Sequence, residues 1–169
     1  DADSIRIAEL SEGKDRTKEV ELASDEINQS TICFSDELES LQGANFYCVC
    51  VPTPIDGDKK PDLGPLEKAC RTVARVLKKG DIVVFESTVY PGATNEVCIP
   101  LLEKHSGLQL NEDFAVWYSP ERINPGDSKR KLENIVKVIS ASSLAALDIL
   151  DRVYGSVIEA GLHRAPSIE

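Results

Sequence analysis

Three short segments of the chain combine proline with small hydroxyl and charged residues, a composition that can hold a ligand. They are residues 51–56 (Val-Pro-Thr-Pro-Ile-Asp), 86–92 (Glu-Ser-Thr-Val-Tyr-Pro-Gly) and 119–126 (Ser-Pro-Glu-Arg-Ile-Asn-Pro-Gly). The hydroxyls of Thr53, Ser87 and Thr88 can donate hydrogen bonds to ribose or carboxamide oxygens, or hold a water molecule. Glu121 can act as a general base or a proton relay. Proline fixes φ, which lowers the entropy cost of holding such groups in place.

Each segment also has a purely structural interpretation. A Thr-Pro pair in a loop is commonly just a turn, and Ser87 and Thr88 can simply cap a helix. Glu121 and Arg122 can form a surface ion pair, which contributes about 0–1 kcal/mol. Gly92, by contrast, lets the backbone pass close to a ligand, and the N-terminus of a following helix favours an anion. All three segments follow short apolar runs that are predicted to be strands. Their shared position at successive strand ends favours a functional site.

The segments each follow a short apolar run, and such runs alternate with amphipathic helices. Strands are predicted at 31–34, 46–51, 81–85, 114–118, 135–139 and 156–160, and helices at 3–12, 20–29, 62–79, 93–102 and 143–154, with a short helix capped by Ser35. This alternation predicts an α/β fold, a mostly parallel sheet with helices on both faces. Ligands bind beyond the carboxyl ends of the strands in such sheets, so we expect the three segments to line one cleft.

The composition fits one globular domain and argues against several classes of partner. The chain has 169 residues, a net charge of −10 and 41% hydrophobic residues, enough for a sizeable core. No apolar run approaches the roughly 20 residues of a membrane helix. A pI near 4.7 argues against binding to nucleic acid or to an anionic membrane. The chain contains no Met and opens at Asp1, which indicates processing or a piece of a longer protein.

Five cysteines at irregular spacing do not suggest a disulfide framework, which favours a reducing, cytoplasmic location. Two of them, Cys48 and Cys50, would share one face of the strand at 46–51. Such a Cys-x-Cys pair can bind a metal or carry out redox chemistry. The alternative is that both are small apolar residues in a buried strand, a common role of free cysteine. We favour the buried interpretation and predict no metal site.

The order of these motifs resembles the UDP-glucose/GDP-mannose dehydrogenase family, and within it the UDP-N-acetylhexosamine 6-dehydrogenases of capsule and O-antigen synthesis. The resemblance runs nearly end to end, and its most specific part is the string Tyr-Ser-Pro-Glu-Arg-Ile-Asn-Pro-Gly-Asp at 118–127. It implies an N-terminal Rossmann domain that binds NAD, then a long central helix and a UDP-sugar-binding half. Members oxidise the C6 alcohol of the sugar to a carboxylate in two NAD-dependent steps, and a homo-oligomer is expected.

The resemblance also implies roles for individual residues. Asp1 matches the acidic residue that holds the adenosine ribose hydroxyls, and Arg6 matches a basic residue near the adenosine end of NAD. The remaining cofactor contacts implied are Val51, Pro52, Thr53, Ser87 and Thr88, of which the threonines line the nicotinamide side. Thr88 would also act with Glu121, positioning water and relaying protons during hydrolysis of a thioester.

Several parts of the family pattern are expected to lie outside this chain. The glycine-rich phosphate loop would precede Asp1, and the catalytic Cys would follow Glu169. We therefore expect residues 1–169 to be a truncated NAD-binding domain that lacks its first β-α-β unit, the central helix and the UDP-sugar-binding domain, and that is inactive alone. The strand edge left open would favour a non-native dimer. The alternative function is a non-catalytic α/β module, receiver-like or protein-binding.

Overall fold

The computed structural model describes residues 3–16, 31–121 and 134–169. The chain divides into two units, Asp1–Gln42 and Gly43–Glu169, and each is described by itself. In the part of the chain that is described, no helix is both long and apolar enough to cross a membrane.

The first unit contains helix α1 (Ser4–Ser11) and the 3₁₀ turn η1 (Leu38–Leu41). Asp3 caps α1, because its carboxylate accepts hydrogen bonds from the backbone N–H groups of Ile5 and Arg6. The helix predicted at 3–12 is therefore confirmed, and the short helix predicted after Ser35 is the turn η1. The strand predicted at 31–34 is wrong: these residues pair with no strand of the described chain. The helix predicted at 20–29 lies outside the described residues.

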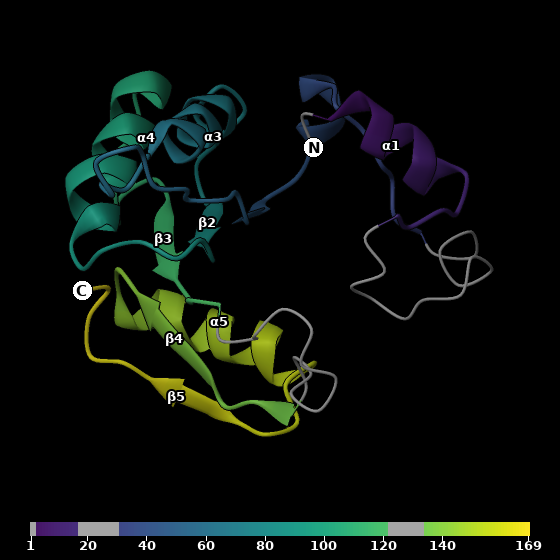
Figure 1. The fold of residues 1–169 in the computed structure, drawn as a ribbon. Coiled ribbons are helices and arrows are strands. Elements are labelled where there is room, and N and C mark those ends of the chain that lie inside the picture. Colours follow the sequence, from purple (N-terminus) through teal and green to yellow (C-terminus); the bar gives the residue numbers. More distant parts are fainter. Residues whose placement is uncertain (1–2, 17–30, 122–133) are drawn as a thin grey trace. The chain divides into compact units, whose positions relative to one another are not determined.

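The second unit is built on a five-stranded sheet of order β1-β2-β3-β4-β5 (Figure 1). The strands are β1 (Phe46–Val49), β2 (Ile82–Phe85), β3 (Ala115–Tyr118), β4 (Lys137–Ala141) and β5 (Leu162–Arg164). Strands β1, β2 and β3 are parallel, β4 is antiparallel to β3, and β5 is parallel to β4. The sheet is thus mostly parallel, as predicted.

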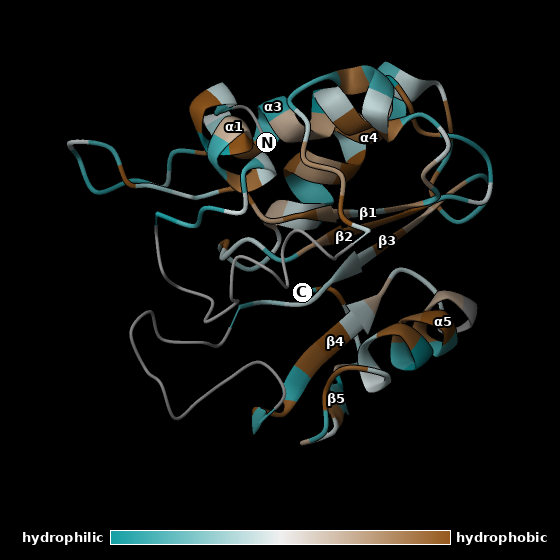
Figure 2. Cartoon of the chain, turned by 90° about the vertical axis from the view of Figure 1, so that its right-hand side faces the viewer, coloured by the Kyte–Doolittle hydropathy of each residue, from teal (hydrophilic) through white to brown (hydrophobic). Residues whose placement is uncertain are grey.

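Helices cover the two faces of this sheet (Figure 1). Helix α3 (Gly64–Ala74), the π-helical turn η2 (Thr94–Cys98) and helix α4 (Ile99–Ser106) pack together, and helix α5 (Leu144–Gly155) packs on β3 and β4. The core beneath α5 contains Val84, Trp117, Ile139 and Leu150, all fully buried. Apolar residues therefore run along the strands, as the hydropathy colouring of β2 and β4 shows (Figure 2).

Two predicted elements differ from the structure, namely the last strand and the end of the helix predicted at 62–79. The last strand is β5, and the strand predicted at 156–160 is wrong because these residues form turns. The backbone N–H groups of Val157 and Ile158 both donate to the Tyr154 carbonyl, which closes the end of α5, and Ile158 is buried in the core. Helix α3 ends at Ala74, earlier than predicted, where the N–H groups of Arg75 and Val76 donate to carbonyls only three residues back. In the turn that follows, the buried Asp81 carboxylate accepts from the Lys78 N–H.

Candidate functional site

The carboxyl ends of β1, β2 and β3 meet at one edge of the sheet. Val49 pairs with Phe85, and Phe85 pairs with Tyr118, so the last residues of the three strands are in register. The ladder continues one step further, because the Glu86 N–H donates to the Val49 carbonyl (2.9 Å) and the Ser119 N–H to the Phe85 carbonyl (3.0 Å). The three predicted segments therefore begin at the same edge of the sheet, as the parallel arrangement requires.

Two side-chain hydrogen bonds join the first segment to the second. Thr53 Oγ1 donates to the Thr88 carbonyl at 2.6 Å, and Ser87 Oγ donates to the Val51 carbonyl at 2.7 Å. Ser87 is buried, with 5% of its surface exposed. The protons of these two hydroxyls are thus donated within the protein and fix the loops, whereas Thr88 and Pro52 are exposed at the surface of the loops.

The third segment leaves β3 beside the other two. Ser119 is fully buried and donates to the Val138 carbonyl at 2.8 Å, which fixes the start of the loop. Glu121, two residues further on, is exposed, and residues 122–133 lie outside the described chain. Burial raises the pKa of Tyr118, whose phenol hydrogen-bonds the Val89 backbone in the second segment. The end of β3, from which the third segment leaves, is therefore tied to the second segment.

Gly92 marks the turn from the second segment into η2. Its φ of +95° belongs to the left-handed region, and a Cβ there would lie 3.1 Å from Glu96 Oε1. The Gly92 carbonyl accepts from the Glu96 N–H at 2.8 Å, which begins the helical segment. The single helix predicted at 93–102 is η2 followed by α4. The turn that brings the backbone close to this edge therefore depends on glycine.

A buried charged cluster next to these loops escaped the sequence analysis. Glu86 Oε1 accepts a hydrogen bond from the Tyr154 hydroxyl and lies 3.7 Å from the Nζ of Lys137. Lys137 is 4% exposed, and its Nζ lies 5.2 Å from the centroid of the Tyr154 ring. Burial, together with Glu86, raises the pKa of Tyr154. A lysine inside the apolar run 135–139 was the available signal, since a lysine there needs a buried partner.

Cys48 and Cys50 are exposed, so the prediction that they are buried is wrong. Tyr47 and Val49 are the buried residues of β1. The Tyr47 hydroxyl donates to the carbonyls of Ala44 and of Val76, which follows α3. Cys48 lies on the opposite face of this edge strand, and Cys50 follows the strand. A hydrogen bond from Cys48 lowers the pKa of the Cys50 thiol, while the carboxylates of Glu86 and Glu121 oppose that shift.

The two residues predicted to bind the adenosine end of NAD, Asp1 and Arg6, belong to the first unit or lie outside the described residues. Asp1 lies outside the described residues. Arg6 belongs to the first unit, where its Nη2 lies 2.6 Å from Asp15 Oδ1 in a largely buried ion pair. Both roles stay predictions. The hydrogen bonds at this edge bring together Val51, Thr53, Ser87 and Thr88, with Pro52 between the first two, and Glu121 lies two residues beyond Ser119 on the third segment; their roles also stay predictions.

Three parallel strands with polar loops at their shared carboxyl edge are typical of a Rossmann-type nucleotide-binding domain. Residues 1–158 match the family model described as UDP-glucose/GDP-mannose dehydrogenase family, NAD binding domain. The chain therefore belongs to the UDP-glucose/GDP-mannose dehydrogenase family, and its matched part is the domain that binds NAD.

Curated relatives match over the whole chain. A UDP-N-acetyl-D-glucosamine 6-dehydrogenase of Pseudomonas aeruginosa is 52% identical over 170 residues, covering 100% of this chain and 40% of the relative. The enzyme of the same name from Salmonella typhi is 48% identical over 170 residues, with the same coverage of 100% and 40%. The chain thus spans about 40% of the length of these relatives.

Solved structures agree with the family assignment. The UDP-D-ManNAc dehydrogenase of Pyrococcus horikoshii superposes with a TM-score of 0.90 at 33% identity, covering 99% of this chain and 40% of that one. The GDP-mannose dehydrogenase of Pseudomonas aeruginosa gives a TM-score of 0.89 at 26% identity, covering 100% of this chain and 40% of that one. Both structures, each of a sugar-nucleotide dehydrogenase, superpose on nearly the whole of this chain. The Rossmann-like fold that was predicted is therefore confirmed.

Proposed function

We propose that this chain is the NAD-binding part of a UDP-N-acetylhexosamine 6-dehydrogenase, which oxidises the C6 alcohol of its UDP-sugar to a carboxylate in two steps. The observation that carries the proposal is that three polar loops begin at one sheet edge, where the Thr53–Thr88 and Ser87–Val51 hydrogen bonds join the first loop to the second. The 52% identity to a UDP-N-acetyl-D-glucosamine 6-dehydrogenase supports the substrate class.

The residues at this edge fit a dinucleotide. Val51, Pro52 and Thr53 place backbone groups and a fixed loop at the end of β1, and the exposed Thr88 lies on the adjacent loop. Ser87 is buried beneath them and holds the Val51 carbonyl, so it acts as a positioning residue. Asp1 and Arg6 would bind the adenosine end. NAD, when bound, accepts a hydride from the sugar carbon in each oxidation.

The chain also contributes groups for proton transfer. Thr88 can hold a water molecule through its hydroxyl. The exposed Glu121 carboxylate can accept a proton from that water as the water attacks the carbonyl carbon of the expected thioester and displaces the thiolate. Glu121 is accordingly proposed as the base, and Thr88 as the residue that orients the water.

The finer biological setting is part of the same proposal. The relatives' names indicate oxidation of a nucleotide sugar, so the substrate would be a UDP-N-acetylhexosamine, and we infer that the product is used in polysaccharide synthesis. We place the protein in the cytoplasm, where NAD and nucleotide sugars occur together, and infer a homo-oligomer. No nucleic-acid or membrane partner is proposed, which agrees with the acidic pI of about 4.7.

A chimera tests the proposal. In the Pseudomonas aeruginosa relative, the segment that aligns with this chain would be replaced by residues 1–169, so that the host supplies the rest of the enzyme. Calorimetric titration should show NAD binding within about tenfold of the host's affinity, a difference of about 1.4 kcal/mol. Thr88→Val should weaken NAD binding, and Ser40→Ala, on η1 in the other unit, should not. A folded chimera that binds no NAD would favour the non-catalytic module instead.

A further inference from the structure

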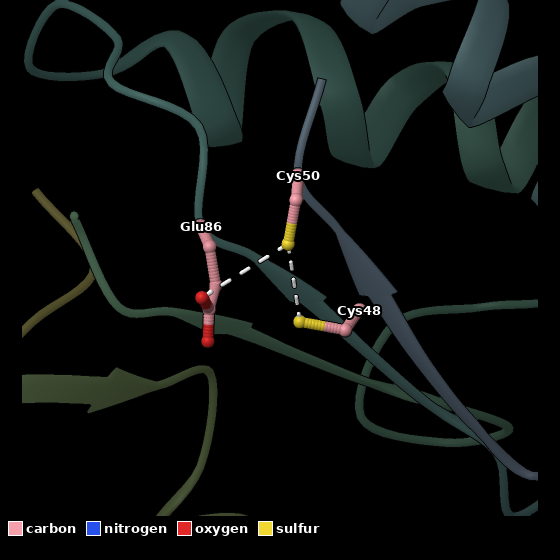
Figure 3. Close-up of side chains that lie close together, drawn as sticks. All are labelled: Cys48, Cys50 and Glu86. Atoms are coloured by element: carbon pink, nitrogen blue, oxygen red, sulfur yellow. Dashed lines mark hydrogen bonds between the residues drawn. The ribbon is translucent and has the colours of Figure 1, made fainter. Parts of the chain in front are cut away.

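Cys48, Cys50 and Glu86 bring three potential metal ligands together outside the residues assigned to NAD (Figure 3). The two Sγ atoms are 3.5 Å apart, and Cys50 Sγ lies 4.0 Å from Glu86 Oε2. All three ligand atoms lie within 4.8 Å of one another. We propose that this cluster binds a thiophilic divalent cation of the Zn²⁺ type.

The spacing of the ligand atoms fits a tetrahedral ion. With Zn–S bonds of about 2.3 Å and a Zn–O bond of about 2.1 Å, tetrahedral angles place two sulfurs about 3.8 Å apart and a sulfur and an oxygen about 3.6 Å apart. The observed 3.5 Å and 4.0 Å separations each differ from these values by a few tenths of an ångström. The third separation, between Cys48 Sγ and the Glu86 carboxylate, is within 4.8 Å, so two of the three spacings are already close to tetrahedral and water would be the fourth ligand.

The Glu86 carboxylate is held in place through its Oε1 atom. Oε1 accepts the hydrogen bond from Tyr154 and lies 3.7 Å from Lys137 Nζ, so the other oxygen, Oε2, is turned toward Cys50. Ligating carboxylates in metal sites are commonly oriented by such hydrogen bonds from a second set of residues. The two anchoring residues come from α5 and β4, so the carboxylate is fixed by elements distant in sequence.

The charges of the cluster also balance. Two thiolates and a carboxylate carry three negative charges, which a divalent cation and the ammonium of Lys137 neutralise completely. Lys137 approaches the carboxylate on the oxygen that faces away from the thiols, so it does not compete for the ion's position. Both cysteines are exposed, which gives an ion and its water ligand access.

The donor set predicts which ions bind. Thiolate ligands favour Zn²⁺ and Cd²⁺ and disfavour Mg²⁺ and Ca²⁺, which prefer oxygen ligands. With the purified, fully reduced chain, competition against a chromophoric chelator should show one Zn²⁺ bound per chain. Co²⁺ should give a thiolate-to-cobalt charge-transfer band, and Mg²⁺ in excess should displace neither ion.

Single substitutions assign the ligands. Cys48→Ser and Cys50→Ser should each raise the Kd for Zn²⁺ at least about 100-fold, because loss of a ligand exceeds the 10–100-fold cost of losing an outer-shell partner. Glu86→Gln should raise the Kd less than either cysteine substitution, because the amide oxygen that replaces the carboxylate can still coordinate the ion but is neutral. Cys33→Ser is the matched control, because Cys33 is also exposed but lies in the other unit. Binding as tight in the Cys48→Ser/Cys50→Ser double variant as in the parent chain would overturn the proposal.

A measurement on the unmodified chain guards against variants that fail to fold. Zn²⁺ should protect Cys48 and Cys50 from alkylation, as mapped by peptide mass, while Cys33 stays reactive. Equal alkylation of all three cysteines with and without Zn²⁺ would also overturn the proposal. Because this test requires neither NAD nor a sugar nucleotide, its outcome is independent of the proposed dehydrogenase function.

Discussion

The hydroxyl of Thr53 donates to the carbonyl of Thr88 at 2.6 Å, and this bond ties the loop after β1 to the loop after β2. The two residues are far apart in sequence, yet parallel pairing of their strands places them side by side. Each is also a residue proposed to face NAD. The bond therefore couples the position of one cofactor loop to that of the other.

Removing this hydrogen bond should weaken cofactor binding. We expect Thr53→Val in the chimera to raise the Kd for NAD up to about tenfold, since a hydrogen bond contributes about 0.5–1.5 kcal/mol. Thr53→Ser keeps the hydroxyl and should bind NAD nearly as the parent does. Calorimetric titration of the three proteins measures the difference. Equal affinities for all three would show that the bond does not position the loops.

Glu121 should affect turnover rather than binding. Glu121→Gln in the chimera removes the proposed proton acceptor, and we expect kcat to fall by about 10²–10⁴, the usual contribution of general acid–base catalysis. The Kd for NAD should stay unchanged. Glu112→Gln, at another exposed carboxylate just before β3, is the control. An unaltered kcat in Glu121→Gln would remove this residue from the mechanism.

The Tyr154–Glu86 contact should contribute to stability. Tyr154→Phe removes the hydroxyl that donates to Glu86, and hydrogen bonds to charged groups contribute about 1.5–3 kcal/mol. The free energy of unfolding, from urea titration, should fall by about that amount. Tyr90→Phe serves as the control, because the Tyr90 hydroxyl lies 3.3 Å from Glu96 at an exposed site, where its loss should change the free energy of unfolding much less. Equal effects of the two substitutions would contradict the importance of the buried cluster.

The Arg164–Asp151 pair should make stability depend on pH. Arg164 donates to both carboxylate oxygens of Asp151, and this hydrogen bonding holds the pKa of Asp151 below its ordinary value. A carboxyl with a lowered folded-state pKa stabilises the fold above its unfolded pKa of about 3.9, and that stabilisation is lost as the pH falls through the folded pKa. Asp151→Asn should therefore lower Tm at pH 7 and lose this effect in acid.

Asp148→Asn is the comparison for this pair. Asp148 Oδ1 lies 3.7 Å from Arg164 Nη1, and the Asp148 side chain is 73% exposed, so its removal should change Tm little at any pH. Melting curves of the parent chain and both variants across the acid range measure the effect. A Tm difference for Asp151→Asn that does not vary with pH would indicate that packing, not the charge pair, is responsible.

The strands and their loops could be predicted because local sequence determines them. Apolar runs end at Pro52, Glu86 and Ser119, and parallel pairing then brings the three loops to one edge. The last strand was misplaced because Ile158 is apolar for a different reason: it anchors the end of α5 in the core. Periodicity alone does not distinguish a short strand from such an anchor.

The buried cluster and the exposed thiols depend on tertiary structure. Glu86, Lys137 and Tyr154 come from three distant elements, so no spacing in the sequence relates them. Cys48 and Cys50 lie in a run that is apolar on both faces, and the sequence does not indicate which face of β1 is covered. The metal-site proposal therefore rests on the structure, whereas the NAD-site residues follow from sequence motifs.

The most direct test of the central claim is the rate of NADH formation by the chimera with NAD and UDP-N-acetyl-D-glucosamine, the substrate class in the host's name. If residues 1–169 form the NAD-binding part of such a dehydrogenase, the chimera should form NADH at a rate within about tenfold of the host, or about 1.4 kcal/mol in activation free energy. The purified chain alone should form none. A folded chimera that produces no sugar-dependent NADH, with the host fully active under the same conditions, would contradict the claim.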